Sequence, residues 1–331
     1  MPNAKYDVLG IGNAIVDVLA STDDSFLLER GLAKGGMQLL DAEAAEQLYR
    51  EMGPGVEASG GSAANTIAGI ASLGGRAAFV GKVKQDQLGE IFAHDVRALG
   101  VHFDTEPATD GPSTARCLIL VTPDAQRTMN TYLGACVTLG PDDVDPDLVR
   151  DAGVTYLEGY LWDPPAAKEA FRKAMAIAHG AGRKVALTLS DAFCVERYRE
   201  EFQDLVGNGV DIVFANEAEI ISLYQVESFD DALQRLRGHS TLVALTRSEK
   251  GSVVVTGDEV HVIDPERVAH PLDTTGAGDQ YAAGFLFGYT RGLDLVRCGA
   301  LGGMAAAEVI SHYGARPETS LEELARSKGL V

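Results

Sequence analysis

The sequence is poor in cysteine and in positive charge, and each shortage excludes a class of protein. Its four cysteines are scattered, with no CxxC pair and no histidine at metal-ligand spacing, so we expect buried free thiols in a reduced, cytoplasmic protein. Lysine and arginine number 28 against 48 acidic residues. The resulting net charge of −20 argues against nucleic acid or an anionic membrane as a partner.

Long apolar runs and two common nucleotide-binding motifs are also missing. No stretch reaches the roughly 20 apolar residues that a membrane span requires. The apolar run 8–20 is interrupted by Asp17 and lacks a basic flank and a clear cleavage site, so we expect no signal peptide. Gly10-Ile11-Gly12 follows a strand-like run, but Ile15 stands where a dinucleotide fingerprint has its third glycine. No Gly-x-x-x-x-Gly-Lys-Ser/Thr sequence occurs either, which excludes a P-loop.

What the chain does have is a regular alternation of short apolar runs with helical patterns. The expected strands are 8–11, 77–80, 154–157, 185–189, 211–214 and 241–246, and the expected helices are 87–99, 166–179, 196–206 and 217–224. From Asp273 onward the pattern is nearly all helical. This alternation predicts an α/β fold with a mostly parallel central sheet flanked by helices, formed as a single domain over residues 1–331.

Two segments, about 13–52 and 113–136, interrupt the alternation. In the second, the apolar run 115–121 and the run 127–132 flank the polar turn 122–126, which predicts a β-hairpin. We expect the two segments to form a small antiparallel sheet outside the main one, in the role of a lid.

The most informative stretch is Asp273–Phe285, where a glycine turn precedes an aspartate and an apolar helix. Gly276 and Gly278 allow positive φ and a close approach of a ligand to the backbone. The helix that follows directs its free N–H groups and positive dipole end at the turn, which suits an anion. Asp279 lies beside this anion hole, where it can take a proton from a hydroxyl, and the helix end should lower its pKa. The arrangement suits phosphoryl transfer to an alcohol.

Near the N-terminus, residues 60–68 repeat this logic. Two glycines precede Ser62, a residue that caps helices well. Asn65 on the first turns offers both a donor and an acceptor, which suits vicinal hydroxyls. The structural alternative is a plain capped helix.

Two later motifs also have both a structural and a functional interpretation. Asn216 and Glu219 follow an expected strand, at the edge where open α/β sheets bind ligands. They either form a capping box or place Glu219 on a water of hydrated Mg²⁺. The polar segment 246–252 is either a turn between strands or a loop over nucleotide phosphates.

Together these motifs resemble the PfkB/ribokinase family of carbohydrate and nucleoside kinases. Residues 273–285 are similar to the family's C-terminal signature and 60–89 to its N-terminal signature. The Asn-x-x-Glu element at 216–219 and the Thr-x-x-x-x-Gly turn at 246–251 lie between them in family order. The resemblance implies a ribokinase-like fold with a small β-sheet lid. It also implies an ATP-dependent kinase that uses Mg²⁺ and, in some members, K⁺.

The resemblance further implies roles for individual residues. By it, Asp279 is the catalytic base and the anion hole consists of Gly276, Ala277 and Gly278. The remaining implied ligands are Asp17, Gly61 and Asn65 for the substrate's hydroxyls, Asn216, Thr246 and Gly251 for phosphate, Glu219 for Mg²⁺, and Asp273 with Thr275 for a monovalent cation.

Within the family, the chain is most similar to the adenosine kinase branch. Residues 12–17 resemble that branch's opening, which adds Asn13 to the substrate site. Residues 126–130 resemble its lid strand, whose Arg127 can approach the transferred phosphoryl group. Met37, Tyr160 and Trp162 would face a nucleobase or, as the alternative, lie in the core.

The resemblance leaves the acceptor open. In the segment 188–193, Thr188 and Ala192 replace the branch's usual asparagine and proline, so guanosine, inosine and cytidine stand beside adenosine. A sugar or sugar-acid kinase for ribose, fructose or 2-keto-3-deoxygluconate is the alternative. A non-catalytic ligand-binding relative is a third reading, which an intact Asp279 argues against. Lids in this family stand alone or pair, so both a monomer and a homodimer are consistent with the sequence.

Overall fold

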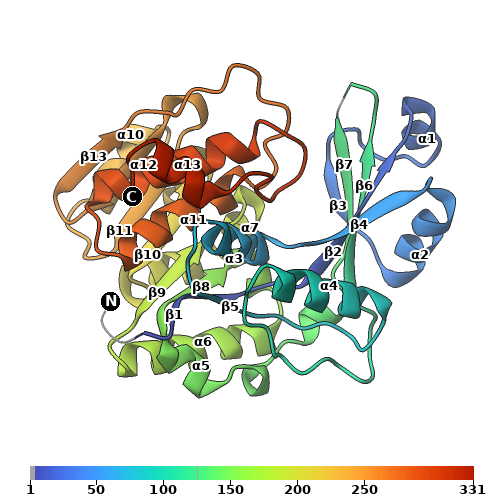
Figure 1. The fold of residues 1–331 in the computed structure, drawn as a ribbon, viewed down its shortest axis with the longest axis horizontal. Coiled ribbons are helices and arrows are strands. Elements are labelled where there is room, and N and C mark those ends of the chain that lie inside the picture. The colour runs from blue at the N-terminus through green and yellow to red at the C-terminus, as the bar shows by residue number, and fades with distance from the viewer. Residues whose placement is uncertain (1–3, 125) are drawn as a thin grey trace.

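The computed structural model describes residues 4–124 and 126–331, whose strands form two sheets (Figure 1). The larger sheet contains, from one edge to the other, β13 (Glu259–Ile263), β12 (Ser252–Thr256), β11 (Leu242–Thr246), β10 (Ile212–Asn216), β9 (Lys184–Thr188), β8 (Ala152–Glu158), β1 (Tyr6–Ile11) and β5 (Ala77–Val80). Strands β11 to β5 pair in parallel, and only β12 and β13 join antiparallel at one edge. The expected mostly parallel α/β sheet is confirmed.

Helices cover both faces of this sheet. One face carries α3 (Ser62–Ser72), α4 (Gln87–Ala98), α11 (Ala277–Thr290), α12 (Leu295–Val309) and α13 (Leu321–Ser327). The other carries α5 (Pro146–Asp151), α6 (Pro165–Gly180), α7 (Ala192–Arg197), α8 (Arg199–Asp204), α9 (Glu217–Tyr224) and α10 (Phe229–Leu236). Successive residues of β1 enter opposite layers, Val8 one and Leu9 the other, and both are fully buried. This double burial explains why the strands read as continuous apolar runs.

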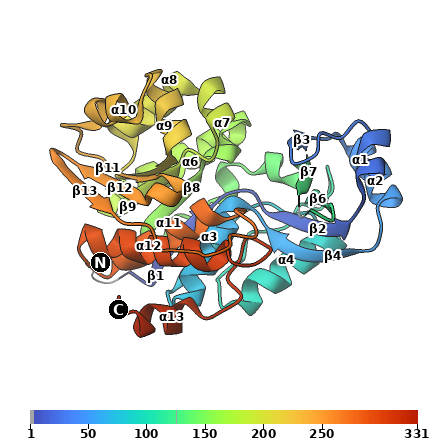
Figure 2. The same cartoon turned by 90° about the horizontal axis from the view of Figure 1, so that it is seen from above.

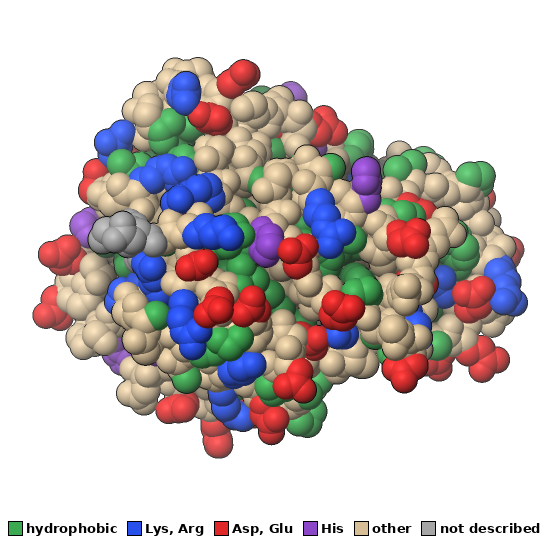
Figure 3. Space-filling model, turned by 60° about the horizontal axis from the view of Figure 1, so that its bottom comes forward, with side chains coloured by type: hydrophobic (Ala, Val, Ile, Leu, Met, Phe, Trp, Pro, Cys, Tyr) green, Lys and Arg blue, Asp and Glu red, His purple; other side chains and the backbone are tan. Residues whose placement is uncertain are grey.

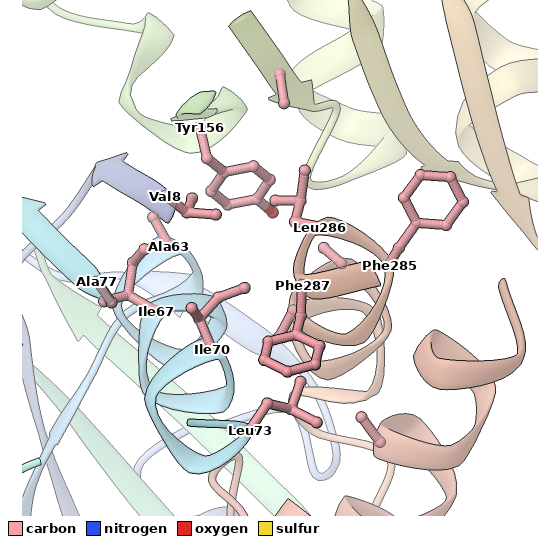
Figure 4. Close-up of a cluster of buried hydrophobic side chains, with 14 of the residues drawn as sticks. Val8, Ala63, Ile67, Ile70, Leu73, Ala77, Tyr156, Phe285, Leu286 and Phe287 are labelled. Atoms are coloured by element: carbon pink, nitrogen blue, oxygen red, sulfur yellow. The ribbon is translucent and has the colours of Figure 1, made fainter. Parts of the chain in front are cut away.

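The layer around α3 and α11 matters most for the site because both helices begin there. In Figure 4, Ile67 and Ile70 of α3 face Leu286 and Phe287 of α11, next to Tyr156 of β8. All five side chains are nearly or completely buried. This packing fixes the two helix N-termini relative to each other.

The second sheet lies beside the first, at one end of the molecule (Figure 2). Its strands are, in order, β3 (Met37–Leu39), β7 (Arg127–Tyr132), β6 (Ala115–Val121), β2 (Ile15–Ser21) and β4 (Gly55–Gly60). Helices α1 (Asp24–Glu29) and α2 (Ala42–Glu51) accompany it, and Leu27 and Leu48 join its own small core.

Two expectations about the small sheet are wrong. It is mixed rather than antiparallel, because β2 pairs in parallel with β6 and β3 with β7. Its edge strand β4 also lies beyond the boundary at residue 52 expected for the first segment. The antiparallel β6–β7 hairpin itself forms, with Leu118 opposite Asn130. Its expected turn, 122–126, contains Ala125, which lies outside the described residues.

The helix expected over 196–206 is also different in the structure. It is divided into α7, which begins four residues earlier, and α8. Asp191 caps α7 by accepting from the Phe193 N–H, and Tyr198 at φ −123 and ψ 29 interrupts the helix. No helix in the described part of the chain is long and apolar enough to cross a membrane. On the face shown in Figure 3, acidic and basic side chains are interspersed.

Candidate active site

The glycine turn before α11 forms the expected helix N-terminus. Gly276 caps the helix at φ 79, in the left-handed region that favours glycine. A Cβ at this position would also lie 2.7 Å from the backbone of Ala315, so no side chain fits. Gly278, in contrast, is helical, and a Cβ there would meet nothing within 4 Å. The expectation of positive φ at Gly278 is therefore wrong, and the backbone at this point is open to a ligand.

Asp279 lies in the first turn of α11, and two side chains of α3 donate to it. The Ser62 hydroxyl donates to Oδ1 at 2.6 Å, and Asn65 Nδ2 donates to Oδ2 at 3.2 Å. Burial nevertheless raises the pKa of Asp279 to about 6, against the effect of these two donors. The expected lowering is wrong, because desolvation outweighs the two hydrogen bonds that favour the carboxylate form. Asp279 is still largely ionised at pH 7, and it is a stronger base than expected.

Asp17 approaches the same place from β2 of the small sheet. Burial raises the pKa of Asp17 to about 6, against the positive charges of Arg316 and Arg127 and with the negative charge of Asp279. A Cβ on Gly60 would lie 2.4 Å from the Asp17 carboxylate, so this carboxylate needs a glycine beside it. Two carboxylates and two guanidinium groups therefore share one electrostatic neighbourhood.

Gly61 and Asn13 lie where the chain passes between the two sheets. Gly61 precedes α3 at φ 96, and a Cβ there would lie 2.3 Å from the Asn13 carbonyl oxygen. Asn13 donates to Glu158 from both its side chain and its backbone, with Nδ2 at 2.6 Å from Oε1 and the backbone N at 3.2 Å from Oε2. In this structure Asn13 connects the segment between β1 and β2 to the end of β8, and its side-chain amide nitrogen donates to Glu158.

Glu158, at the end of β8, was not found from the sequence. It is 1% exposed and also accepts from the Ala63 N–H at 2.9 Å, so it ties the start of α3 to the Asn13 segment. Burial raises the pKa of Glu158 to about 7. The sequence signal that could have pointed to it is Gly12. The structure shows why a glycine is needed there: a Cβ on Gly12 would lie 2.3 Å from Glu158 Oε2. A glycine at that strand end is consistent with a buried group beside it.

Arg127 and Asp273 form a buried ion pair between the sheets. Arg127 Nη1 lies 2.8 Å from Asp273 Oδ2, and the two side chains are 8% and 7% exposed. Asp273 also accepts from the Thr275 N–H and hydroxyl and from the Gly314 N–H. This carboxylate is saturated with protein donors, so its oxygens are not open to a monovalent cation in this conformation.

The Asn216–Glu219 element forms the capping box given above as the structural alternative. Asn216 Oδ1 accepts from the Glu219 N–H, and the Glu219 carboxylate accepts from the Asn216 side chain and backbone. Glu219 is 5% exposed, and burial raises its pKa to about 7. Thr246 pairs with Asn216 across β10 and β11, and Gly251 at φ 81 closes the following turn. These residues therefore lie together at the carboxyl ends of β10 and β11 and in the turn that follows β11.

The three aromatic and apolar residues expected to face a nucleobase or to lie in the core differ in their burial. Trp162 is core: it is 2% exposed, packs against Phe171 and Phe202, and donates from Nε1 to a glutamate. Met37 and Tyr160 are 51% and 37% exposed and remain available to a ligand.

Arg316 is the second residue that sequence reasoning missed. It follows α12, donates from Nε to Asn65 Oδ1 at 3.3 Å and from Nη1 to Ser59 Oγ. No motif marks it, because only the packing of its loop against the glycine turn brings it to the site.

No cluster of three or more histidine, cysteine, aspartate or glutamate side chains suited to a metal is present among residues 4–124 and 126–331. The site instead combines the Asp279 carboxylate, a helix N-terminus and an arginine beside an open α/β sheet. These parts define a class: kinases that phosphorylate a small alcohol, in which positioning and electrostatics supply most of the catalysis.

Comparison with known proteins identifies the family. Residues 39–322 match the family model of the pfkB family carbohydrate kinases, and the chain belongs to this family. The expected family and the ATP-dependent kinase activity are confirmed. The curated sequence of probable fructokinase-4 from Arabidopsis thaliana is 30% identical over 70% of this chain and 73% of its own.

Two solved structures match almost the whole chain. The adenosine kinase from Sinorhizobium meliloti is 60% identical with a TM-score of 0.92, over 98% of this chain and 100% of that one. A probable sugar kinase from Rhizobium etli CFN 42 is 55% identical with a TM-score of 0.93, over 99% and 100% of the two chains. The ribokinase-like fold with its small second sheet is thus confirmed.

Proposed function

We propose that this protein is a nucleoside kinase that transfers the γ-phosphoryl group of ATP to the 5′-hydroxyl of a nucleoside, with adenosine as the first candidate. One observation carries the nucleoside assignment: the 60% identity with the Sinorhizobium meliloti adenosine kinase over nearly the full length of both chains. The site geometry supports the chemistry, because Asp279, Asn65 and Asp17 converge beside the N-terminus of α11.

In the proposed mechanism, Asp17, Asn65 and the backbone at Gly61 hold the ribose hydroxyls. The 5′-hydroxyl oxygen bonds to the γ-phosphorus while the Asp279 carboxylate accepts the hydroxyl proton. The bond between that phosphorus and the oxygen of the leaving ADP breaks. A pKa of about 6 leaves Asp279 ionised and able to accept this proton at pH 7. The transfer is largely dissociative, so the proton can leave late.

The negative charge of the transferred group is stabilised by protein donors. We propose that the amides of Gly276 and Gly278 face it at the start of α11, where the helix dipole is positive. The third expected amide, Ala277 N–H, donates to the Thr274 carbonyl at 3.2 Å in this conformation. Arg127 adds a guanidinium from the small sheet, and we propose that this sheet acts as the lid over the acceptor. Asn216, Thr246 and Gly251 would bind the phosphates of ATP.

We propose that Mg²⁺ binds here through water, because residues 4–124 and 126–331 hold no cluster of three or more acidic, histidine or cysteine side chains. Glu219 is the residue that would hold it, because its carboxylate is fixed by Asn216 at the phosphate-binding edge. When bound, Mg²⁺ neutralises charge on the β- and γ-phosphates. The saturated Asp273 carboxylate does not fit K⁺ in this conformation, so no role is derived for that ion.

A sugar or sugar-acid kinase is the second candidate, favoured by the 55% identity with the probable sugar kinase from Rhizobium etli. The two candidates differ in what lies beyond C1′ of the sugar. Exposed Met37 and Tyr160 favour a flat apolar base over an anionic group. A non-catalytic role is disfavoured, because the two donors that hold Asp279 preserve a reactive base.

The deciding experiment measures ADP release from ATP and Mg²⁺ with adenosine, guanosine, inosine, cytidine, ribose, fructose and 2-keto-3-deoxygluconate. Selective turnover of one nucleoside supports the proposal and identifies the base. Turnover of a free sugar alone overturns the nucleoside assignment and leaves Asp279 as the base.

We place this activity in the cytoplasm, where ATP is available and the four free cysteines stay reduced. Size-exclusion chromatography decides between monomer and homodimer.

A further inference from the structure

The loop after α12 packs directly against the glycine turn. The Ala315 backbone occupies the space where Gly276 would carry a Cβ, and the Ala315 carbonyl accepts from Gln280 Nε2 at 3.0 Å. The Gly314 N–H donates to Asp273 at 2.9 Å. These contacts fix the backbone at Gly314 and Ala315 and therefore the position of Arg316, which follows Ala315.

The Arg316 guanidinium reaches two polar groups on different elements. Nε donates to Asn65 Oδ1 of α3, and Nη1 donates to Ser59 Oγ of β4. The Ser59 N–H in turn donates to Asp95 of α4 at 3.0 Å. Nη2 is buried without a protein partner in the described part of the chain. Arg316 is thus held in one place while its charge acts on nearby Asp17, with which it forms no ion pair among the described residues.

This contact decides which way the Asn65 amide faces. Its oxygen faces the Arg316 guanidinium, so its nitrogen faces the Asp279 carboxylate. The reversed amide would place an oxygen against the carboxylate and an N–H₂ group against the guanidinium, and both contacts would be repulsive. A hydrogen-bonded chain therefore runs from Ser59 through Arg316 and Asn65 to the base.

We propose that Arg316 is a positioning residue for phosphoryl transfer: it holds the Asn65 amide in the one orientation that donates to Asp279. The inference rests on the proposed kinase function, but it holds for a sugar acceptor as well as for a nucleoside, because it concerns the base. Without Arg316 the amide can turn, and Asp279 loses a donor that restrains it.

The charged environment of Asp279 makes this role measurable. Its charge acts on Asp17 from β2, Glu158 and Tyr156 from β8, and Tyr160 from the following turn. Arg127 and Arg316 supply the opposing positive charge at Asp17. The hydrogen bonds from Ser62 and Asn65 both lower the pKa of Asp279. Loss of the Asn65 bond should therefore raise this pKa and move the acid limb of the kcat/KM profile to higher pH.

The experiment is a double-mutant cycle on the full-length protein, with ADP release measured on the best acceptor of the panel. Arg316→Met and Arg316→Lys are each made in the wild type and in Asn65→Ala. We expect each single Arg316 variant to lower kcat at least tenfold, because one ammonium group does not hold two acceptors in a fixed fork. In the Asn65→Ala background the same changes should have almost no further effect. Arg326→Met, which removes a surface ion pair with Glu322, is the matched control and should leave kcat unchanged.

Three results would overturn the proposal. Wild-type kcat in Arg316→Lys would reduce Arg316 to a simple charge, and a full additional loss in the Asn65→Ala background would show that it acts elsewhere. A lowered thermal midpoint with unchanged kcat and pH profile would make it structural only. Should Arg316→Met fail to fold, Arg316→Lys, which keeps the charge and most of the volume, completes the cycle. Failure of the proposed function is recognised separately, because the wild type would then turn over no nucleoside.

Discussion

At the scale of single residues, Asp279 combines a half-buried carboxylate with two fixed donors at the start of a helix. Asp279→Asn keeps the size of the side chain but removes the base. We expect kcat to fall by about a thousandfold or more, with little change in the thermal midpoint, as measured by ADP release and thermal unfolding. Asp294→Asn is the control, because Asp294 caps α12 and asparagine keeps a capping oxygen. Near-normal turnover in Asp279→Asn would exclude Asp279 as the base.

The pKa of Asp279 leads to a second prediction. The carboxylate form is the active one, and the pKa is raised to about 6, so activity is lost as the pH falls through that value. We expect kcat/KM to rise about tenfold per pH unit below pH 6 and to level off above it. The measurement is a kcat/KM profile from pH 4.5 to 8.5 with constant ionic strength. A profile that stays flat down to pH 5 would contradict the raised pKa.

Prediction from the sequence succeeded for residues that belong to one short motif. It failed for properties that depend on burial or on contacts with distant parts of the chain. Gly276 and Asp279 are separated by only two residues, so their turn and helix were predictable. The direction of the Asp279 pKa was not, because desolvation depends on what α3 and the small sheet place over the carboxylate. Glu158 and Arg316 were missed for the same reason, since each reaches the site from a distant part of the chain.

At the scale of elements, the start of α3 depends on a glycine under two constraints. Gly61 has φ 96, and a Cβ would lie 2.3 Å from the Asn13 carbonyl oxygen at the crossing between the sheets. We expect Gly61→Ala to lower the free energy of unfolding by about 3 kcal/mol, from backbone strain and overpacking together. Urea denaturation measures this change.

Gly100→Ala is the matched control for that prediction. Gly100 follows α4 at φ 80, but a Cβ there meets nothing within 4 Å. Only the backbone strain remains, which costs about 1 kcal/mol. Equal losses in the two variants would show that the contact with Asn13 carries no energy.

The small sheet shows where element prediction reaches its limit. The hairpin of β6 and β7 was predictable because a short polar turn joins its strands. The parallel pairing of β2 with β6 was not, because their register is set across about a hundred residues of intervening chain. The edge strand β4 was missed for a related reason: its sequence Gly55–Gly60 is not apolar, and it becomes a strand by pairing with β2.

At the scale of the whole molecule, the ion pair of Arg127 with Asp273 connects the small sheet to the turn before α11. Arg127→Met removes this link and the guanidinium proposed to stabilise the transferred group. We expect kcat to fall by about a hundredfold and hydrogen exchange to increase in β2, β4, β6 and β7, with β8 to β10 unchanged. Hydrogen-exchange mass spectrometry and ADP release test the two parts.

The control for this prediction is Arg116→Met. Arg116 of β6 pairs with Glu46 of α2 at 2.8 Å, the same distance as the Arg127 pair, but both partners belong to the small sheet and its helices. We expect its loss to leave kcat within about twofold of the wild type, since the link between the sheets is intact. A kcat loss as large as that of Arg127→Met would mean that the small sheet responds to any lost ion pair.

The sequence by itself determined the parallel α/β sheet, the family, and two local features of the site: the glycine turn at Gly276 and the helix start that carries Asp279. These features depend on residues close together in the chain, whose backbone preferences and periodicity are readable directly. Only the tertiary structure decided the mixed pairing of the small sheet, the raised pKa of Asp279, and the saturation of Asp273 by Arg127 and Gly314. It also brought Arg316 to Asn65, 251 residues away in sequence. Burial and long-range contact set these properties, because the cost of desolvating a charge and the partners available to it depend on the folded chain.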